Sequence, residues 1–183
     1  MIKNQGIFKP ERMLKRLCDF YPLKDVIEMK DSIKTGLCFG LTSAIITTLG
    51  LIVGLHSFSG SKMVIIGGIV TIAIADAFSD ALGIHVSEEA ENIHKTRDVW
   101  ESTFTTFLTK FLFALTFMIP VLLFELSTAI LICIIYGLSM LSILSYTINK
   151  KEKWKVVLEH ITIALIVVII THYIGDWIAE SFV

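Results

Sequence analysis

Two aspartates lie inside an apolar segment of this sequence, where water is scarce. Asp76 and Asp80 fall within "IAIADAFSDALGIHV", and a spacing of four residues places both carboxylates on one face of a helix. An ionised carboxylate in hydrocarbon is costly, so such side chains usually pair with a cation or mark an ion path. The spacing therefore predicts a cation site within a membrane.

Hydroxyl side chains in the preceding apolar segment, "TSAIITT", lie at a similar depth. At ~1.5 Å per helical residue, counted from the cytoplasmic end of each segment, Ser43 is about 11–14 Å deep and Asp76 about 15 Å deep. Carboxylates with hydroxyls and water suit hard or borderline divalent ions such as Mn²⁺, Fe²⁺, Mg²⁺ or Ca²⁺. We therefore predict a divalent-cation path with these ligands: Asp76, Asp80, Ser43, Thr42 and Thr47.

Other interpretations of these residues stay open. The serine and threonine hydroxyls can bond back to carbonyls four residues earlier in their own helices. Asp80 can lie close enough to the membrane interface to be solvated. Asp76 can form a structural ion pair with Lys110, which lies at a similar depth in the next apolar segment.

Charged residues also gather at the ends of the apolar segments. The segment that holds the aspartates ends in an acidic cluster, which we interpret as a cytoplasmic cation entrance formed by Glu88, Glu89, Glu91 and His85. The last apolar segment carries a stripe with four-residue spacing that is either an outer proton relay or a helix end exposed to water: His172, Asp176 and Glu180.

The elements that must hold these residues are membrane helices. The chain has 183 residues, 54% of them hydrophobic, and a helix of about 20 apolar residues spans a bilayer. The pattern predicts an all-α integral membrane protein with five transmembrane helices, at about residues 36–55, 63–86, 103–124, 126–148 and 156–179. These helices make up a transmembrane domain at residues 35–183.

Lysine and arginine residues set the expected orientation. Eight of them precede the first span, and the loops after the second and fourth spans hold two and four, whereas the other loops hold one and none. The positive-inside rule then places the N-terminus in the cytoplasm and the C-terminus outside. The short loops favour a prokaryotic cell membrane.

Residues 1–34 form the expected cytoplasmic N-terminal segment. In "PERMLKRLCDFYP", apolar residues recur at helical spacing opposite charged ones, which predicts a short amphipathic helix ended by Pro22. This helix lies either on the inner membrane surface or against the cytoplasmic ends of the spans. Its basic residues alternate with acidic ones and no aromatic platform accompanies them, so we expect no nucleic-acid partner.

Small residues, a proline and the cysteines constrain packing. The first span carries glycines that allow another helix to approach closely: Gly36, Gly40, Gly50 and Gly54. Pro120 leaves the carbonyl of Thr116 without its helical partner and should bend the third span. The cysteines are odd in number and far apart, which predicts neither a disulfide framework nor a thiolate metal site: Cys18, Cys38 and Cys133.

Four stretches of the sequence resemble the vacuolar iron transporter family. "GLTSAIITTLGLIVG" resembles the family's glycine-to-glycine motif in the first span, and "ADAFSDALGIHVSEEAE" resembles its second-span stretch with an acidic exit. "IPVLLF" resembles the end of the third span, and "THYIGDWI" the end of the fifth. The resemblance covers about residues 32–182. It implies exchange of cytoplasmic Fe²⁺ or Mn²⁺ for protons by a dimer whose path runs between the two first spans.

The sequence departs from this family at the expected ligands. The family's first-span aspartate falls at Ser43 and its second-span methionine at Asp80, so a carboxylate stands on the facing helix and the soft thioether is absent. The family's glutamate- and methionine-rich segment after the second span is reduced to about "AENIHKTRDVWES". Iron capture by that segment therefore does not carry over.

The residues and the resemblance together predict a homodimer, joined through the first span, that moves Fe²⁺ or Mn²⁺ out of the cytoplasm by proton exchange. We expect no resident cofactor and no enzymatic activity; the partners are the lipid membrane, the metal ions and protons. One alternative is a non-transporting scaffold in which Asp76 and Lys110 fix helix register. Another is an intramembrane metalloenzyme, for which "SEEAENIH" offers paired glutamates although the sequence contains no HExxH zinc motif.

Overall fold

The computed structural model describes residues 30–148 and 151–182, and every regular element in them is a helix. The helices are α3 (Asp31–Ser59), α4 (Lys62–Glu91), α5 (Thr96–Thr116), α6 (Met118–Leu123), α7 (Leu126–Ile148) and α8 (Lys153–Phe182). With α5 and α6 taken as one span, five helices are long and apolar enough to cross a membrane. The predicted all-α fold with five membrane-length helices is confirmed, and it indicates an integral membrane protein. The predicted N-terminal amphipathic helix lies outside the described residues.

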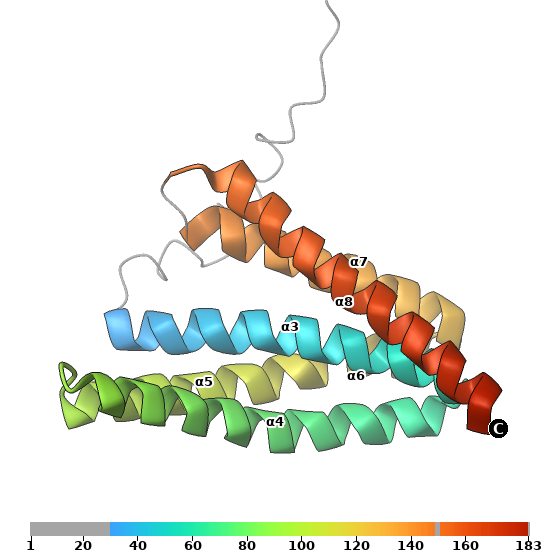
Figure 1. Cartoon of the computed structure of the whole chain (residues 1–183), viewed down its shortest axis with the longest axis horizontal. Helices are drawn as coiled ribbons and strands as arrows, with labels where there is room; N and C mark the ends of the chain where they lie inside the picture. The colour runs from blue at the N-terminus through green and yellow to red at the C-terminus, as the bar shows by residue number, and fades with distance from the viewer. Residues whose placement is uncertain (1–29, 149–150, 183) are drawn as a thin grey trace, which may run out of the picture.

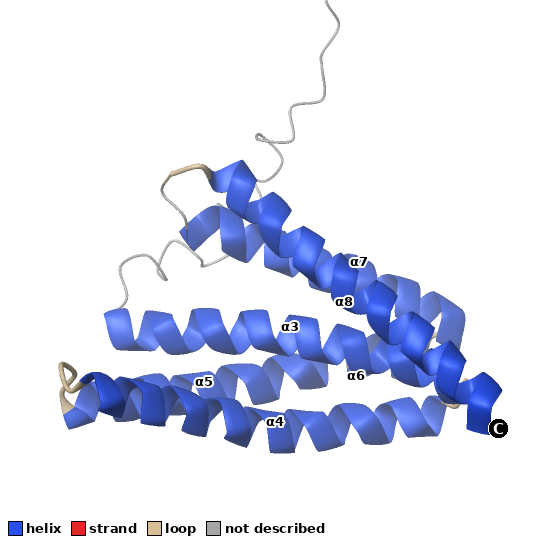
Figure 2. Ribbon diagram, in the orientation of Figure 1, coloured by secondary structure: helices blue, strands red, loops and turns tan. Residues whose placement is uncertain are grey.

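The helix α3 lies at the centre of the bundle (Figure 1). Helices α4 and α5 run along one side of α3, whereas α7 and α8 cross its other side as a pair that diverges toward the start of α3. Figure 2 shows that short loops join the successive helices of the described part. The most extensive packing joins α3 to α5, followed by α4 to α5 and α3 to α8. The first three spans therefore form one closely packed unit.

Glycines allow the close approach of α3 to two neighbours. A Cβ atom at Gly36 would lie 2.5 Å from the backbone oxygen of Ser102 on α5. A Cβ atom at Gly175 on α8 would lie 2.5 Å from the backbone oxygen of Gly54 on α3. A side chain at either position would collide with backbone, so glycine is required. The glycines of α3, which we considered for contact with a second copy of the chain, thus contact other helices of the same chain.

The third span is interrupted close to Pro120. Helix α5 ends at Thr116, and α6 continues in the same direction after Phe117. Pro120 has no N–H with which to bond the carbonyl of Thr116, so the helical ladder has a gap at this point. The expected effect of Pro120 therefore takes the form of a break between two helices rather than a change of direction.

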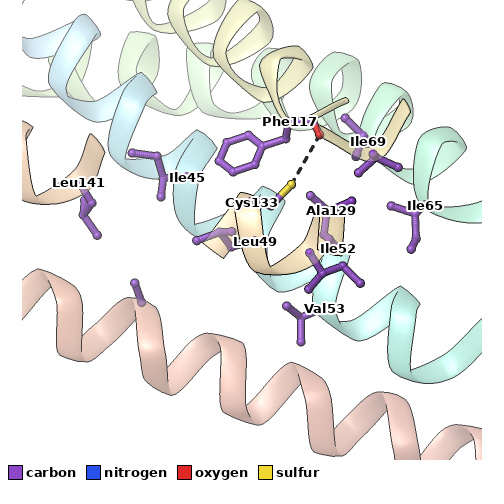
Figure 3. Close-up of a cluster of buried hydrophobic side chains, with 13 residues drawn as sticks. Ile45, Leu49, Ile52, Val53, Ile65, Ile69, Phe117, Ala129, Cys133 and Leu141 are labelled. Carbon is purple, nitrogen blue, oxygen red and sulfur yellow. Dashed lines mark hydrogen bonds between the residues drawn. The ribbon is translucent and has the colours of Figure 1, made fainter. Parts of the chain in front are cut away.

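A compact apolar core lies where α3 and α7 meet this break (Figure 3). Ile45 and Leu49 of α3 are fully buried together with Phe117 and Cys133. The Cys133 thiol donates a weak hydrogen bond to the carbonyl oxygen of Phe117, with an S···O distance of 3.7 Å. In the described part of the chain Cys38 and Cys133 are free thiols, and Cys18 lies outside the described residues.

The outward faces of the outer helices are apolar. Large hydrophobic side chains are exposed along α4 and α8, among them Phe78, Leu82, Leu158 and Trp177. Exposed apolar surface of this extent is unusual on a protein surrounded by water and expected on helices that face lipid. Asp76 and Asp80 of α4 are less exposed, at 27% and 18% of their side chains.

Candidate functional site

The two predicted aspartates meet a buried lysine between the first three spans. Asp76 and Asp80 stand one helical turn apart on α4, Lys110 stands on α5, and Ser43 stands on α3. A Cβ atom at Gly40 would lie 3.3 Å from the backbone nitrogen of Lys110, so this glycine lets α3 approach α5 at the level of the lysine. We call these four side chains, Asp76, Asp80, Lys110 and Ser43, the Lys110 cluster.

The lysine ammonium is the centre of this cluster. Lys110 Nζ lies 2.5 Å from Asp76 Oδ2, 2.5 Å from Asp80 Oδ2 and 2.8 Å from Ser43 Oγ. The Lys110 side chain is 1% exposed, whereas Asp76 is 27% and Asp80 18% exposed. Only Asp80 and Ser43 accept well-aligned hydrogen bonds from the ammonium, and Asp76 Oδ2 is buried without one. The contact with Asp76 is therefore an ion pair held by charge rather than by hydrogen-bond geometry.

The cluster contains one more acidic group than basic groups. Two ionised carboxylates and one ammonium carry a formal charge of −1, and Ser43 adds none. At membrane depth an unbalanced charge is costly and is not screened by salt as a surface charge is. The cluster is therefore one positive charge short of formal neutrality.

An open, mostly apolar groove lies between α3 and α4, and of the four cluster side chains only Asp76 lines it. This α3–α4 groove has a volume of about 680 Å³ and is lined by Thr47, Leu51, Leu55, Gly68, Thr71, Ile72, Ala75, Asp76 and Ser79. Thr47 donates its proton to the carbonyl oxygen of Ser43, and Thr71 donates to that of Gly67, each at 2.8 Å. Their hydroxyl oxygens therefore keep lone pairs that can accept from water or contact a cation.

The predicted path residues divide between two places. Ser43 contacts Lys110, a partner that the sequence did not predict for it, and Thr47 lines the same groove as Asp76. Thr42 instead lines a separate pocket of about 390 Å³ between α3 and the α7–α8 pair, together with Ser145 and His160. Thr42 is adjacent to Ser43 in sequence, and a helix turns adjacent residues to different faces. The structure therefore does not bring Thr42 to the aspartates.

The predicted cytoplasmic entrance is a set of separate pairs. Ser102 donates a hydrogen bond to Glu88 at 2.5 Å, so Glu88 turns inward against α5. Glu89 pairs with His85 at 3.4 Å, and Glu91 pairs with His94 at 3.1 Å. His85 also contacts the Thr103 hydroxyl at 3.0 Å. The carboxylates do not converge on a single point.

Another charged group joins the starts of α3 and α5. Lys30 pairs with Asp98 and with Glu101, the latter at 2.6 Å, and Ser32 donates to Glu101 at 3.0 Å. Hydrogen bonds to Asp98 and then to Glu101 raise the pKa of Lys30 above its usual value of 10.5. These contacts join the N-terminal ends of the two helices that hold Ser43 and Lys110.

The outer stripe on α8 is partly exposed. His172 Nε2 lies 3.4 Å from Asp176 Oδ2, and their side chains are 51% and 45% exposed. Ser57 of α3 also forms a hydrogen bond with the other ring nitrogen of His172. Glu180 is exposed near the end of the helix. The side chains of this stripe are therefore much more exposed than those of the Lys110 cluster.

Sequence reasoning missed two features of the site. Lys110 was considered as a partner of Asp76 alone, yet it holds both aspartates. Thr71 was not singled out, although it lines the α3–α4 groove beside Asp76 together with Ser79. A signal was present, since Gly68, Ile72, Asp76 and Ser79 recur at helical spacing and so share one face of α4.

Comparisons with known proteins do not assign a function to this site. No family model matches the chain, and no curated protein matches it. Within residues 30–148 and 151–182, no group of three or more His, Cys, Asp or Glu side chains is arranged to hold a metal ion. The resemblance to vacuolar iron transporters therefore stays a prediction from short motifs.

Proposed function

We propose that this protein is an integral membrane transporter that exchanges a cation for protons through the Lys110 cluster. The surplus carboxylate is the observation that supports this function most directly. One aspartate would suffice to neutralise Lys110, yet two contact it at 2.5 Å. The second leaves the cluster with a formal charge of −1, which a proton or a cation that enters from the α3–α4 groove can balance.

The finer features of the predicted transporter belong to this proposal. The cation moves out of the cytoplasm and a proton moves in the opposite direction. Fe²⁺ or Mn²⁺ stays a prediction from the sequence, and the proposal itself leaves the ion to the flux panel below. The N-terminus lies in the cytoplasm and the C-terminus outside, in a prokaryotic cell membrane. A homodimer also stays a prediction, but the first-span glycines no longer favour it because they contact α5 and α8 of the same chain.

Flux through liposomes that contain the purified full chain tests the proposed function. A panel of Mn²⁺, Fe²⁺, Na⁺ and K⁺ is added outside, and internal pH and internal cation are followed. We expect coupled movement of at least one cation and protons in the wild type, and its loss in Asp76→Asn and in Asp80→Asn. Glu125→Gln, an exposed carboxylate remote from the cluster, is the matched control and should transport as the wild type does. Undiminished flux in both aspartate variants would remove the cluster from the transport path.

A non-transporting scaffold is the second candidate, and the complete burial of Lys110 favours it. A buried ion pair often adds little net stability compared with apolar residues of similar size, whereas removal of one partner is strongly destabilising. The scaffold therefore predicts that Lys110→Met combined with Asp76→Leu and Asp80→Leu yields a stable protein with altered assembly and unchanged function. The transporter predicts that the same variant is folded and inactive in every flux assay.

A further inference from the structure

The charges that face a cation in the α3–α4 groove come from two helices. Asp76 and Asp80 stand on α4, Lys110 stands on α5, and α3 contributes the neutral hydroxyls of Ser43 and Thr47. A cation that contacts Asp76 therefore meets two negative charges and one positive charge.

Lys110 is held in place by its surroundings. Its side chain is almost completely buried, and it contacts two carboxylates and one hydroxyl. Within the described residues Lys110 pairs with Asp76 and Asp80 of the cluster. The positive charge of Lys110 is therefore held next to these two carboxylates. The opposite side of Asp76 opens to the groove, where Thr47 and Thr71 present oxygen lone pairs after donating their protons to backbone carbonyls.

We infer that the cation bound in the α3–α4 groove is monovalent, of the Na⁺ or K⁺ class, and that Lys110 sets this valence. The inference rests on the proposed function and names the substrate class of the same site. One monovalent cation beside Asp76 brings the formal charge of the cluster from −1 to 0. A divalent cation would change the formal charge from −1 to +1 and leave an unbalanced charge at membrane depth, whereas a monovalent cation removes it. Carboxylate and hydroxyl oxygens are also the hard ligands that alkali cations accept.

A series of substitutions that changes only the charge of the cluster tests this inference. Lys110→Arg keeps the charge at −1 and should keep a monovalent preference. Lys110→Gln changes it to −2 and should reverse the preference in favour of Mn²⁺. Lys110→Gln combined with Asp80→Asn returns it to −1, so the preference should return to Na⁺ or K⁺. The valence of the preferred cation should therefore depend on the total charge of the cluster, and not on which residue carries that charge.

Two measurements on the purified full-length variants read out the preference. The first is the rise in melting temperature in detergent on addition of NaCl, KCl or MnCl₂ at matched ionic strength, which reports binding. The second is flux of each ion in liposomes. We expect wild type and Lys110→Arg to be stabilised mainly by Na⁺ or K⁺, and Lys110→Gln to be stabilised mainly by Mn²⁺. The wild type and Lys110→Arg test the valence even where Lys110→Gln fails to fold.

The outcomes separate this inference from the proposed function. Wild-type protein that binds and transports Mn²⁺ but neither Na⁺ nor K⁺ would overturn the monovalent assignment and leave cation transport standing. A folded Lys110→Gln that keeps the wild-type preference would overturn the role of Lys110. Absence of flux for every cation in the wild type would contradict the proposed function itself.

Discussion

The acidic side chains in the middle of α4 and those at the outer end of α8 have the same four-residue spacing and opposite surroundings. Asp76 and Asp80 contact a lysine that is 1% exposed, from a neighbouring helix. Asp176 pairs with His172 of its own helix at 3.4 Å, and both side chains are about half exposed. The same spacing of acidic residues is therefore found in a buried environment in one helix and in a half-exposed environment in the other. In the middle of α4 the carboxylates pair with a buried side chain of another helix, whereas near the end of α8 a carboxylate pairs with an exposed side chain of its own helix.

The largest difference between the two regions should appear when a partner is removed. Lys110→Gln leaves two carboxylates without their counter-ion, and we expect the free energy of unfolding to fall by about 3–5 kcal/mol in the absence of added cation. Unfolding in detergent, followed by circular dichroism, measures the loss. Addition of Asp80→Asn to the same variant should recover part of it. A loss below about 1 kcal/mol, the range typical of an exposed pair, would show that the cluster is hydrated as the α8 stripe is.

The packing that buries the cluster can be tested at a glycine. A Cβ atom at Gly40 would lie 2.9 Å from the backbone oxygen of Thr106, so Gly40→Ala should separate α3 from α5 beside Lys110 and cost about 1–3 kcal/mol. Gly83 on α4 has no heavy atom within 4 Å of such a Cβ, and Gly83→Ala should stabilise its helix by up to about 1 kcal/mol. Thermal unfolding of the two variants compares them. Equal effects would contradict the close contact at Gly40.

Salt should distinguish the outer stripe from the inner cluster. Because its side chains are about half exposed, Asp176→Asn should change the free energy of unfolding by less than about 1 kcal/mol, and the change should vanish near 1 M salt. The effect of Asp76→Asn should persist at the same ionic strength, since a buried pair is poorly screened. An inert electrolyte that does not bind the cluster, such as a bulky organic ammonium salt, is used for the titration. A salt-sensitive Asp76 variant would place Asp76 in contact with bulk water.

The smallest effect is expected at the exposed start of α3. Lys30 pairs with Asp98 and Glu101, and these contacts raise its pKa above 10.5. A raised pKa in the folded state means that Lys30 stabilises the fold below pH 10.5 and loses this contribution as the pH rises through the raised value. The melting temperatures of wild type and Lys30→Ala should therefore differ slightly at neutral pH and converge at strongly alkaline pH. A difference that persists there would assign the effect to something other than the ion pairs.

The sequence predicted the parts of the site that depend on depth. Hydropathy and length located the five spans, and about 1.5 Å per residue placed Ser43 and Asp76 at one level, where they now contact the same ammonium. The break at Pro120 followed from its missing N–H. These features are local, because each depends on a short stretch of chain and its distance from the membrane surface.

The sequence could not predict how far each helix is rotated about its axis. Thr42 and Ser43 are equally polar and adjacent, yet Ser43 faces α5 and Thr42 faces the α7–α8 side. The glycines of α3 were expected at the interface with a second copy, and they contact α5 and α8 instead. In a membrane helix both the lipid-facing and the protein-facing sides are apolar, so periodicity does not reveal which side is buried.

The sequence by itself determined that this protein consists of five apolar helices with two carboxylates deep in the second, because span length and hydrophobicity are properties of single segments. Only the tertiary structure decided that both carboxylates meet Lys110, with a groove open on the other side of Asp76. That arrangement depends on contacts between residues about 30 positions apart, which the packing of α3 and α4 against α5 creates. The charge of −1, on which the proposed cation chemistry rests, is a property of the assembled helices.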